Sequence, residues 1–179
     1  DPGQADAGGM NVFEYNTARA LALRGHSVDM YTRRTDTDTA TIVEVAERVR
    51  LIHLPAGPST PLAKSAIDAH IDEFSAGLAR LMPYDLIQSH HWMSGVAALP
   101  VARAWGVPHV QSFHSVAAHP GDPLSAGEPP ESGARVAGEA LIAQRSDAII
   151  AVSTAEPRAN QNSQPAARSA MRCAGFCDT

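Results

Sequence analysis

Hydrophobic residues recur along this chain in two patterns, one with a helical period and one in short apolar runs. The clearest helical period forms a single apolar face that ends before Pro83 and consists of Ile67, Ile71, Phe74, Leu78 and Leu81. Similar periods, together with stop signals such as Gly25, predict further helices over 10–25, 95–105 and 133–144. Short apolar runs bounded by turn residues predict strands over 27–32, 42–45, 49–54, 85–89, 108–113 and 147–152.

Strands that alternate with helices of this length are typical of βαβ units. We therefore expect an α/β fold, with a Rossmann-like parallel sheet and helices on both faces. Such a sheet normally opens with a strand that feeds a glycine-rich turn. Here the turn-rich segment 1–9 has no strand before it, so we expect the first strand to be missing. The apolar pattern ends after Thr154, which predicts an incomplete domain over 1–154 and an irregular or non-native tail over 155–179.

Composition narrows the class of protein. The chain has 179 residues, of which 44% are hydrophobic, enough for one domain with a real core. Its formal net charge of -5 argues against a broad nucleic-acid surface, although a small phosphorylated ligand needs only two or three well-placed cations. No apolar run approaches the roughly 20 residues of a membrane span, and no cleavable signal heads the sequence. These features predict a soluble, cytoplasmic protein.

In open α/β sheets, ligands bind at the carboxyl ends of the strands, and two candidate segments follow from this rule. Gly9 and Asn11 lie where a turn opens the first predicted helix, so the backbone can approach a ligand and the helix N-terminus favours an anion. A plain tight turn also explains the glycine. His90 and His91 belong to the run 89–95, which leaves a buried strand and enters a helix. Each histidine alone could be a core residue, but the cluster of polar and aromatic residues favours a site.

Four further residues could act on a ligand at the same edge. His114 ends a predicted strand and can offer either ring nitrogen as donor or acceptor, and Ser115 could donate to a phosphate or cap a turn. Arg135 near a helix N-terminus opposes the helix dipole, so either a bound anion or an ion pair with Glu139 one turn on explains it. Lys64 is the only lysine of the chain, and it is either solvated or a phosphate ligand.

Other chemistries are excluded by missing motifs. The chain has no G-x-G-x-x-G, and Asp29, the acidic residue at the spacing expected for a ribose contact, lies inside a predicted strand, which disfavours NAD binding. It also lacks the G-x-S-x-G elbow, the G-x-x-x-x-G-K-[ST] loop and H-E-x-x-H. Cys173 and Cys177 have no second His/Cys pair nearby, and the eight histidines are scattered, so we predict no metal cluster.

Six ordered segments resemble the N-terminal domain of retaining, GT-B-fold glycosyltransferases of family 4. The resemblance runs from about residue 2 to residue 154 and rests on segments 6–12, 23–28, 53–58, 89–95, 106–115 and 135–139. It implies transfer of a sugar, with retention, from a nucleotide-sugar donor such as UDP-GlcNAc to a polar or phosphorylated acceptor such as inositol phosphate. A front-face mechanism, in which the leaving phosphate helps to deprotonate the acceptor, would require no metal and no carboxylate nucleophile.

The resemblance also implies roles for individual residues. Gly9 would approach the donor diphosphate, Asn11 would contact the acceptor and His114 would face the reacting sugar. The phosphorylated acceptor would be bound by Lys64, His91, Ser115 and Arg135. Two of these depart from the family members that use inositol phosphate, because His91 stands for a tyrosine and Ser115 for a threonine. Serine keeps the hydroxyl, whereas histidine shortens the reach and makes the contact dependent on pH.

In GT-B enzymes a second domain supplies most donor contacts. We therefore expect this chain to hold the acceptor half of the site and to be inactive alone, and the full-length protein is a candidate homodimer. Three alternatives stay open: a truncated, non-catalytic product, a sucrose-phosphate-synthase-like transferase with another acceptor, and an epimerase acting on phosphate-bearing sugars, which would share the two-domain architecture.

Overall fold

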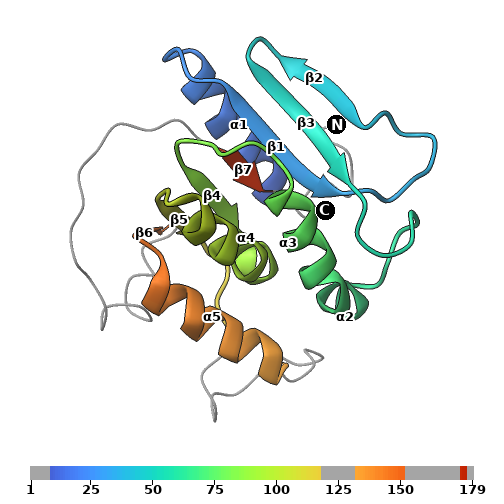
Figure 1. The fold of residues 1–179 in the computed structure, drawn as a ribbon, viewed down its shortest axis with the longest axis vertical. Helices are drawn as coiled ribbons and strands as arrows, with labels where there is room; N and C mark the ends of the chain where they lie inside the picture. Colours follow the sequence, from blue (N-terminus) through green and yellow to red (C-terminus); the bar gives the residue numbers. More distant parts are fainter. Residues whose placement is uncertain (1–8, 118–131, 152–173, 177–179) are drawn as a thin grey trace.

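The fold is built around one seven-stranded sheet with the strand order β2-β3-β1-β7-β4-β5-β6 (Figure 1). The computed structural model describes residues 9–117, 132–151 and 174–176, and the side chains of all of these except Lys64 and the last three. The strands are β1 (Val28–Arg33), β2 (Ile42–Ala46), β3 (Val49–Leu54), β4 (Ile87–His90), β5 (His109–Ser112), β6 (Ala148–Ile150) and β7 (Ala174–Phe176).

The predicted helices are all present, with small shifts at their ends. They are α1 (Gly9–Ala22), α2 (Lys64–Ile67), the 3₁₀ turn η1 (Asp68–His70), α3 (Ile71–Ala79), α4 (His91–Trp105) and α5 (Gly133–Arg145). The apolar face over 67–81 is thus carried by three short elements in series. Helix α4 starts four residues before its predicted start, directly at the end of β4. Within the described residues, no helix has the length and apolar character needed to cross a bilayer.

Parallel pairing dominates the sheet, as predicted. Strand β1 runs parallel to β3, and β4 runs parallel to β5, while the edge strand β2 pairs with β3 in the antiparallel sense. Every residue of β1, β4 and β5 is buried, which is typical of strands covered on both faces, whereas β2 is largely exposed.

The centre of the sheet differs from the prediction. Strand β7 lies between β1 and β4 and is parallel to both. The segment 155–179 was expected to be an irregular or non-native tail, and within it Ala174–Phe176 forms this strand, while the other tail residues lie outside the described residues. Three residues are too short to show an apolar period, so only pairing with the neighbouring strands identifies this segment.

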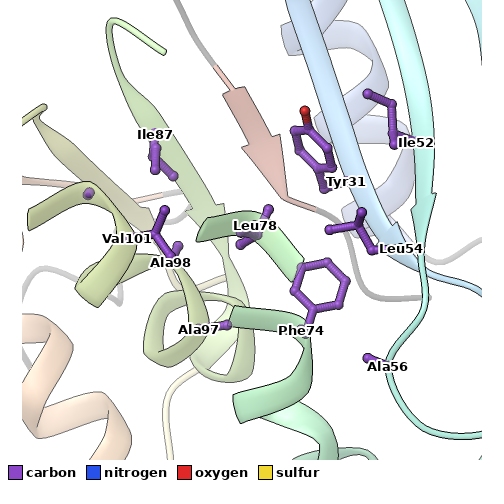
Figure 2. Close-up of a cluster of buried hydrophobic side chains, with 11 residues drawn as sticks. Tyr31, Ile52, Leu54, Ala56, Phe74, Leu78, Ile87, Ala97, Ala98 and Val101 are labelled. Atoms are coloured by element: carbon purple, nitrogen blue, oxygen red, sulfur yellow. The ribbon is translucent and has the colours of Figure 1, made fainter. Parts of the chain in front are cut away.

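Helices cover both faces of the sheet. On one face, Ala18 and Leu21 of α1 pack on apolar residues of β1 and β3. On the other face, α3 and α4 pack on Tyr31, Ile52 and Leu54 (Figure 2). The helical residues of that second cluster include Phe74, Leu78, Ala97, Ala98 and Val101. The prediction of an α/β sheet with helices on both faces is confirmed.

Close packing of α4 on α5 sets the position of the α5 N-terminus. A Cβ atom at Gly138 of α5 would lie 2.9 Å from Cε3 of Trp92 and 3.0 Å from Cγ2 of Val96. A Cβ atom at Gly95 of α4 would lie 2.6 Å from Cδ1 of Ile142. The separations of 2.9 Å and 2.6 Å are shorter than any that real Cβ atoms show, so the two helices approach each other through their glycines. This helix contact at Gly138 lies about one turn after the first turn of α5, so it fixes where that first turn lies.

Candidate active site at the ends of β4 and β5

The parallel strands β4 and β5 end at the same edge of the sheet. His90 and Ser112 are paired in the register of β4 and β5, and each is the last residue of its strand. His91 then adopts a φ of 66° and His114 a φ of 61°, both in the left-handed region. This region is costly for most residues other than glycine, and residues held in it cluster at active sites and ligand-binding segments. The candidate histidines are therefore held at a common edge by strained backbone.

Arg135 and Ser115 meet at this edge. The Nη2 of Arg135 donates a hydrogen bond to Oγ of Ser115 at 3.1 Å, although 20 residues separate them in the sequence. The Nε of Arg135 donates to Oε1 of Glu139 at 2.8 Å, and Oε2 of Glu139 accepts from the backbone N–H of Ala117, also at 2.8 Å. Thus the predicted Arg–Glu pair forms, but it bridges α5 to the loop after β5 and does not lie on a solvated face.

The electrostatics of this edge suit an anion only in part. Arg135 and Glu139 have side chains exposed by 16% and 12%, so their mutual charge compensation is screened little by solvent. The N-terminus of α5, capped by Ser132 Oγ accepting from the Arg135 N–H, adds the positive end of a helix dipole. One guanidinium and one carboxylate leave the local charge near zero, so the N-terminus of α5 supplies the net positive field that a phosphate would meet here.

His114 lies next to Ser115 and is held by two aromatic neighbours. Its Nε2 is 2.8 Å from Nδ1 of His90. The ring of Phe13 on α1 packs edge-on against both imidazoles, with centroid distances of 5.3 Å to His114 and 6.1 Å to His90. Burial, reinforced by the nearby His114, lowers the pKa of His90 to about 3, so His90 is neutral at physiological pH. His114 is partly exposed, whereas His90 is buried.

Glu14 of α1 joins these two histidines, which the sequence pattern did not reveal. Its Oε1 is 3.6 Å from Nδ1 of His90, and both side chains are buried. Glu14, His90 and His114 each offer one ligand atom, and the three atoms all lie within 4.8 Å of one another. The prediction of no metal cluster rested on histidines scattered along the sequence, and the fold brings two of them, His90 and His114, together. Spacing along the chain failed to show the group because three separate elements supply its members.

A layer of buried polar side chains supports this edge from below. The hydroxyl of Ser89 donates to Oε1 of Gln111 at 2.6 Å and lies 2.7 Å from Nε2 of His109. Gln111 in turn donates through Nε2 to the carbonyl oxygen of His91 at 3.0 Å. Gln111 therefore fixes the backbone at the start of α4, where His91 takes its left-handed conformation. In a buried polar network of this kind, each side chain is held in one position because leaving its hydrogen-bond partner unsatisfied would be costly.

The remaining predicted residues are placed as follows. Gly9 and Asn11 occupy the first turn of α1, and a Cβ at Gly9 would meet no atom within 4 Å, so open space surrounds it. Lys64 begins α2, but its side chain lies outside the described part of the chain. The loop before α2 is fixed by buried Arg33, which donates to the carbonyl oxygens of Pro58 and Thr60, both at 2.8 Å. In Figure 1, α2 and the first turn of α5 lie at the same end of the molecule.

Asp29 is engaged in hydrogen bonds with two neighbouring side chains. Its carboxylate accepts from Nε and Nη2 of Arg50 at 2.7 and 2.6 Å, and from the Tyr84 hydroxyl at 2.5 Å. Burial alone would raise the pKa of Asp29, but the hydrogen bonds from Arg50 and Tyr84 hold it below its ordinary value. The carboxylate is therefore charged and fully engaged with protein groups.

Comparison with known proteins agrees with the overall architecture of the chain. Residues 8–170 match the family of glycosyl transferase 4-like domains. The chain belongs to the glycosyl transferase 4-like family. The prediction of family 4 and of the N-terminal half of a GT-B fold is confirmed by this match and by the solved structures below.

Curated members of the glycosyl transferase 4-like family are similar to this chain over most of its length. A D-inositol 3-phosphate glycosyltransferase of Nocardiopsis dassonvillei is 41% identical over 163 residues, covering 88% of this chain. A protein of the same name from Kineococcus radiotolerans is 39% identical over an equal span. The aligned region is 38% of each relative, so this chain spans little more than a third of their length.

A solved member of the same fold is the sucrose-phosphate synthase of Thermosynechococcus elongatus. It superposes on this chain with a TM-score of 0.78 and 26% sequence identity. The match covers 85% of this chain and 39% of the synthase. This chain therefore corresponds to one part of each of these longer proteins.

Proposed function

We propose that this chain forms the acceptor-binding part of a retaining glycosyltransferase. The transferase would move a sugar from a nucleotide donor such as UDP-GlcNAc to a phosphorylated polyol, of which inositol phosphate is the leading candidate. The family match supports a glycosyltransferase, and the names of the curated relatives support the inositol phosphate acceptor. A place in mycothiol synthesis in an actinobacterial cytoplasm would follow from that acceptor.

The observation that carries the proposal is the contact between Arg135 and Ser115 beside His114. Arg135 Nη2 lies 3.1 Å from Ser115 Oγ, so a guanidinium and a hydroxyl face the same point at the edge of the sheet. An acceptor phosphate placed there would receive hydrogen bonds from both groups and the field of the α5 N-terminus. Lys64, which begins α2, would supply a second cation. His91 would contact the polyol from the start of α4.

The chemistry requires an acceptor hydroxyl, a donor sugar and a departing diphosphate held in line. The hydroxyl oxygen forms a bond to the anomeric carbon on the face from which the diphosphate leaves, and the bond from that carbon to the diphosphate oxygen breaks. The hydroxyl proton passes to the departing phosphate oxygen, so charge and protons balance without a carboxylate base. His114 would position the reacting sugar, and Gly9 and Asn11 would line the approach to donor and acceptor.

Binding of the separate substrates tests the proposal. Isothermal titration of this chain with inositol 1-phosphate should show one site, and UDP-GlcNAc should bind weakly in the absence of the remainder of the transferase. Arg135→Ala and Lys64→Ala should each weaken inositol phosphate binding by at least tenfold, since each removes a charged contact to phosphate. Arg145→Ala at the opposite end of α5 is the matched control and should leave binding unchanged.

Two other results would point elsewhere. Absence of binding to inositol 1-phosphate, with binding to a hexose phosphate that Arg135→Ala abolishes, would favour a sucrose-phosphate-synthase-like transferase, in line with the structural neighbour. Failure of any phosphorylated polyol or sugar to bind a folded chain would favour a non-catalytic product.

A further inference from the structure

The carboxyl end of β1 carries a buried cation that the proposed function does not use. Arg33 is the last residue of this strand and is only 4% exposed. Its guanidinium donates to the backbone carbonyl oxygens of Arg34, Pro58 and Thr60, at 3.2, 2.8 and 2.8 Å. No carboxylate among the described residues pairs with it. Because a buried charge without a charged partner is costly, an anion bound beside Arg33 would stabilise it.

Arg33 also has donors left for such an anion. Nη1 donates to two of the three carbonyl oxygens and Nη2 donates to the third. Within the part of the chain that the structure describes, Nε–H and the second N–H of Nη2 have no acceptor. These two neighbouring nitrogens can bind both oxygens of one carboxylate. Arg50 binds Asp29 in this manner, with Nε and Nη2 at 2.7 and 2.6 Å from the two carboxylate oxygens.

A small pocket adjoins Arg33. The space inside it amounts to about 270 Å³, including the solvent at its mouth, so it admits a ligand of only a few heavy atoms. His70 forms one part of the wall, and the remaining lining is apolar and includes Ala56, Ile67, Phe74, Met93 and Ala97. Figure 2 shows three of these apolar residues, Ala56, Phe74 and Ala97, within the core cluster. A cation beside apolar walls suits an anion that carries a short hydrocarbon part.

The wall of the pocket is held in place by the loop before α2. A Cβ atom at Gly57 would lie 2.6 Å from Nε2 of His70, so the imidazole packs directly on the backbone of this loop. The carboxylate of Glu73 accepts a hydrogen bond from the Gly57 N–H and is thereby engaged with the loop as well. Arg33 bonds two further carbonyl oxygens of the same loop. The cation and the wall therefore belong to one preformed unit.

We propose that Arg33 and this pocket bind a small aliphatic monocarboxylate. The carboxylate would accept hydrogen bonds from Nε and Nη2 of Arg33, and the hydrocarbon part would lie against Ile67 and Met93. Inorganic phosphate fits less well, because apolar walls offer no donors to its other oxygens. The pocket lies between α2, which begins at Lys64, and α4, which begins at His91, but neither of these residues lines it. The site is thus distinct from the proposed acceptor contacts and does not rest on the proposed function.

Titration with propionate tests the proposal without any sugar substrate. The side-chain Nε–H resonances of the ¹⁵N-labelled chain are followed by NMR at constant chloride concentration, and Arg33→Lys identifies the Arg33 resonance. We expect this resonance to shift saturably, with a dissociation constant in the millimolar range. Propionamide, which has nearly the same shape and no charge, should leave the resonance in place. Inorganic phosphate should require a higher concentration than propionate to shift it.

Two variants check where propionate binds, with the methyl resonances of Ile67 as the readout. Arg33→Lys should weaken binding at least tenfold, because an ammonium group cannot replace the paired donors. Met93→Trp should do the same by filling the pocket, while every hydrogen bond of Arg33 stays in place. Arg34→Lys is the matched control and should bind as the parent does, since Arg34 does not line the pocket and its guanidinium donates to Thr41. Circular dichroism checks that each variant is folded.

The outcomes separate the proposal from its alternatives. Propionate binding that a folded Met93→Trp chain retains would overturn the proposal, since the carboxylate would then bind elsewhere. A shift that propionamide reproduces, or that phosphate produces at lower concentration than propionate, would also overturn it. If no ligand shifts the Arg33 resonance, the loop carbonyl oxygens alone compensate the guanidinium, and the proposal fails.

Discussion

The guanidinium of Arg135 donates to the hydroxyl of Ser115 at 3.1 Å and thereby connects the first turn of α5 to the loop that follows β5. Glu139 reinforces this connection, because its carboxylate bonds both the guanidinium and the backbone N–H of Ala117. A loop that follows a strand is normally more mobile than the elements that it connects. Here one arginine and one glutamate hold the loop in register with a helix N-terminus.

Loss of the Glu139 carboxylate should therefore reduce acceptor affinity without removing any cation. In Glu139→Gln, Arg135 loses its charged partner and the Ala117 N–H loses a charge-assisted hydrogen bond. We expect inositol 1-phosphate to bind about tenfold more weakly, the effect of roughly 1.4 kcal/mol. Calorimetric titration measures the change, and Gln144→Ala, exposed near the end of α5, should have none. Unchanged affinity would show that Glu139 does not orient Arg135.

The glycine contact between α4 and α5 should be sensitive to a single methyl group. Gly138→Ala places a Cβ 2.9 Å from Trp92 Cε3, so the helices must separate or Trp92 must move. Overpacking of this kind costs about 1–3 kcal/mol in the free energy of unfolding, measured by urea denaturation. Gly133→Ala is the matched control, because a Cβ there meets no atom within 4 Å. Equal stability of the two variants would contradict the close approach of the helices.

Buried His109 should make the fold sensitive to mild acid. Burial lowers the pKa of His109 to about 4, although nearby Asp147 acts in the opposite direction. The unfolded chain takes up a proton near pH 6.5 whereas the folded chain does not, so stability falls as pH decreases from about 6.5 to 4. The total loss from this one group is on the order of 3 kcal/mol. Urea midpoints across this range measure it, and His109→Gln should remove about one proton from the uptake on unfolding. An unchanged slope in His109→Gln would contradict this assignment.

Asp29 should stabilise the fold and leave ligand binding unaffected. Its lowered pKa means that its contribution is complete above the ordinary carboxyl pKa of 3.8 and is lost as pH falls further. Asp29→Asn removes the negative charge that accepts hydrogen bonds from Arg50 and Tyr84. We expect the free energy of unfolding to fall by about 1–3 kcal/mol at neutral pH, and solvent around the half-exposed Arg50 side chain moderates the effect. Chemical denaturation measures the loss, and exposed Asp36→Asn should be neutral. A fall in inositol phosphate affinity in a folded Asp29→Asn chain would contradict a purely structural role.

Periodicity predicted most of the elements because each depends on local sequence. The helix over 133–144 and the strands 42–45 and 49–54 follow from residues that are neighbours in the chain. Strand β7 could not be predicted this way, since its pairing with β1 and β4 is entirely long-range. The sequence pattern therefore predicted the α/β class, but it did not predict that β7 lies between β1 and β4.

The candidate site divides along the same line. The rule that ligands bind at strand ends selected His114, Ser115 and Arg135, and the structure brings the last two into contact. Glu14 escaped notice because one acidic residue in an amphipathic helix is normally solvated, and only the packing of α1 on β4 turns it inward. The support that Gln111 gives to His91 escaped for a related reason, since a glutamine in a strand carries no signal of its partner.

The left-handed backbone at His91 and His114 has a consequence for efforts to improve this protein. Each φ near 60° costs on the order of 1 kcal/mol for a side-chain-bearing residue and almost nothing for glycine. Screens that reward heat resistance alone would accordingly enrich glycine at these two positions and would remove the two imidazoles that we propose contact the acceptor and the reacting sugar. Under the proposed function, selection for stability and selection for activity would therefore favour different residues at positions 91 and 114.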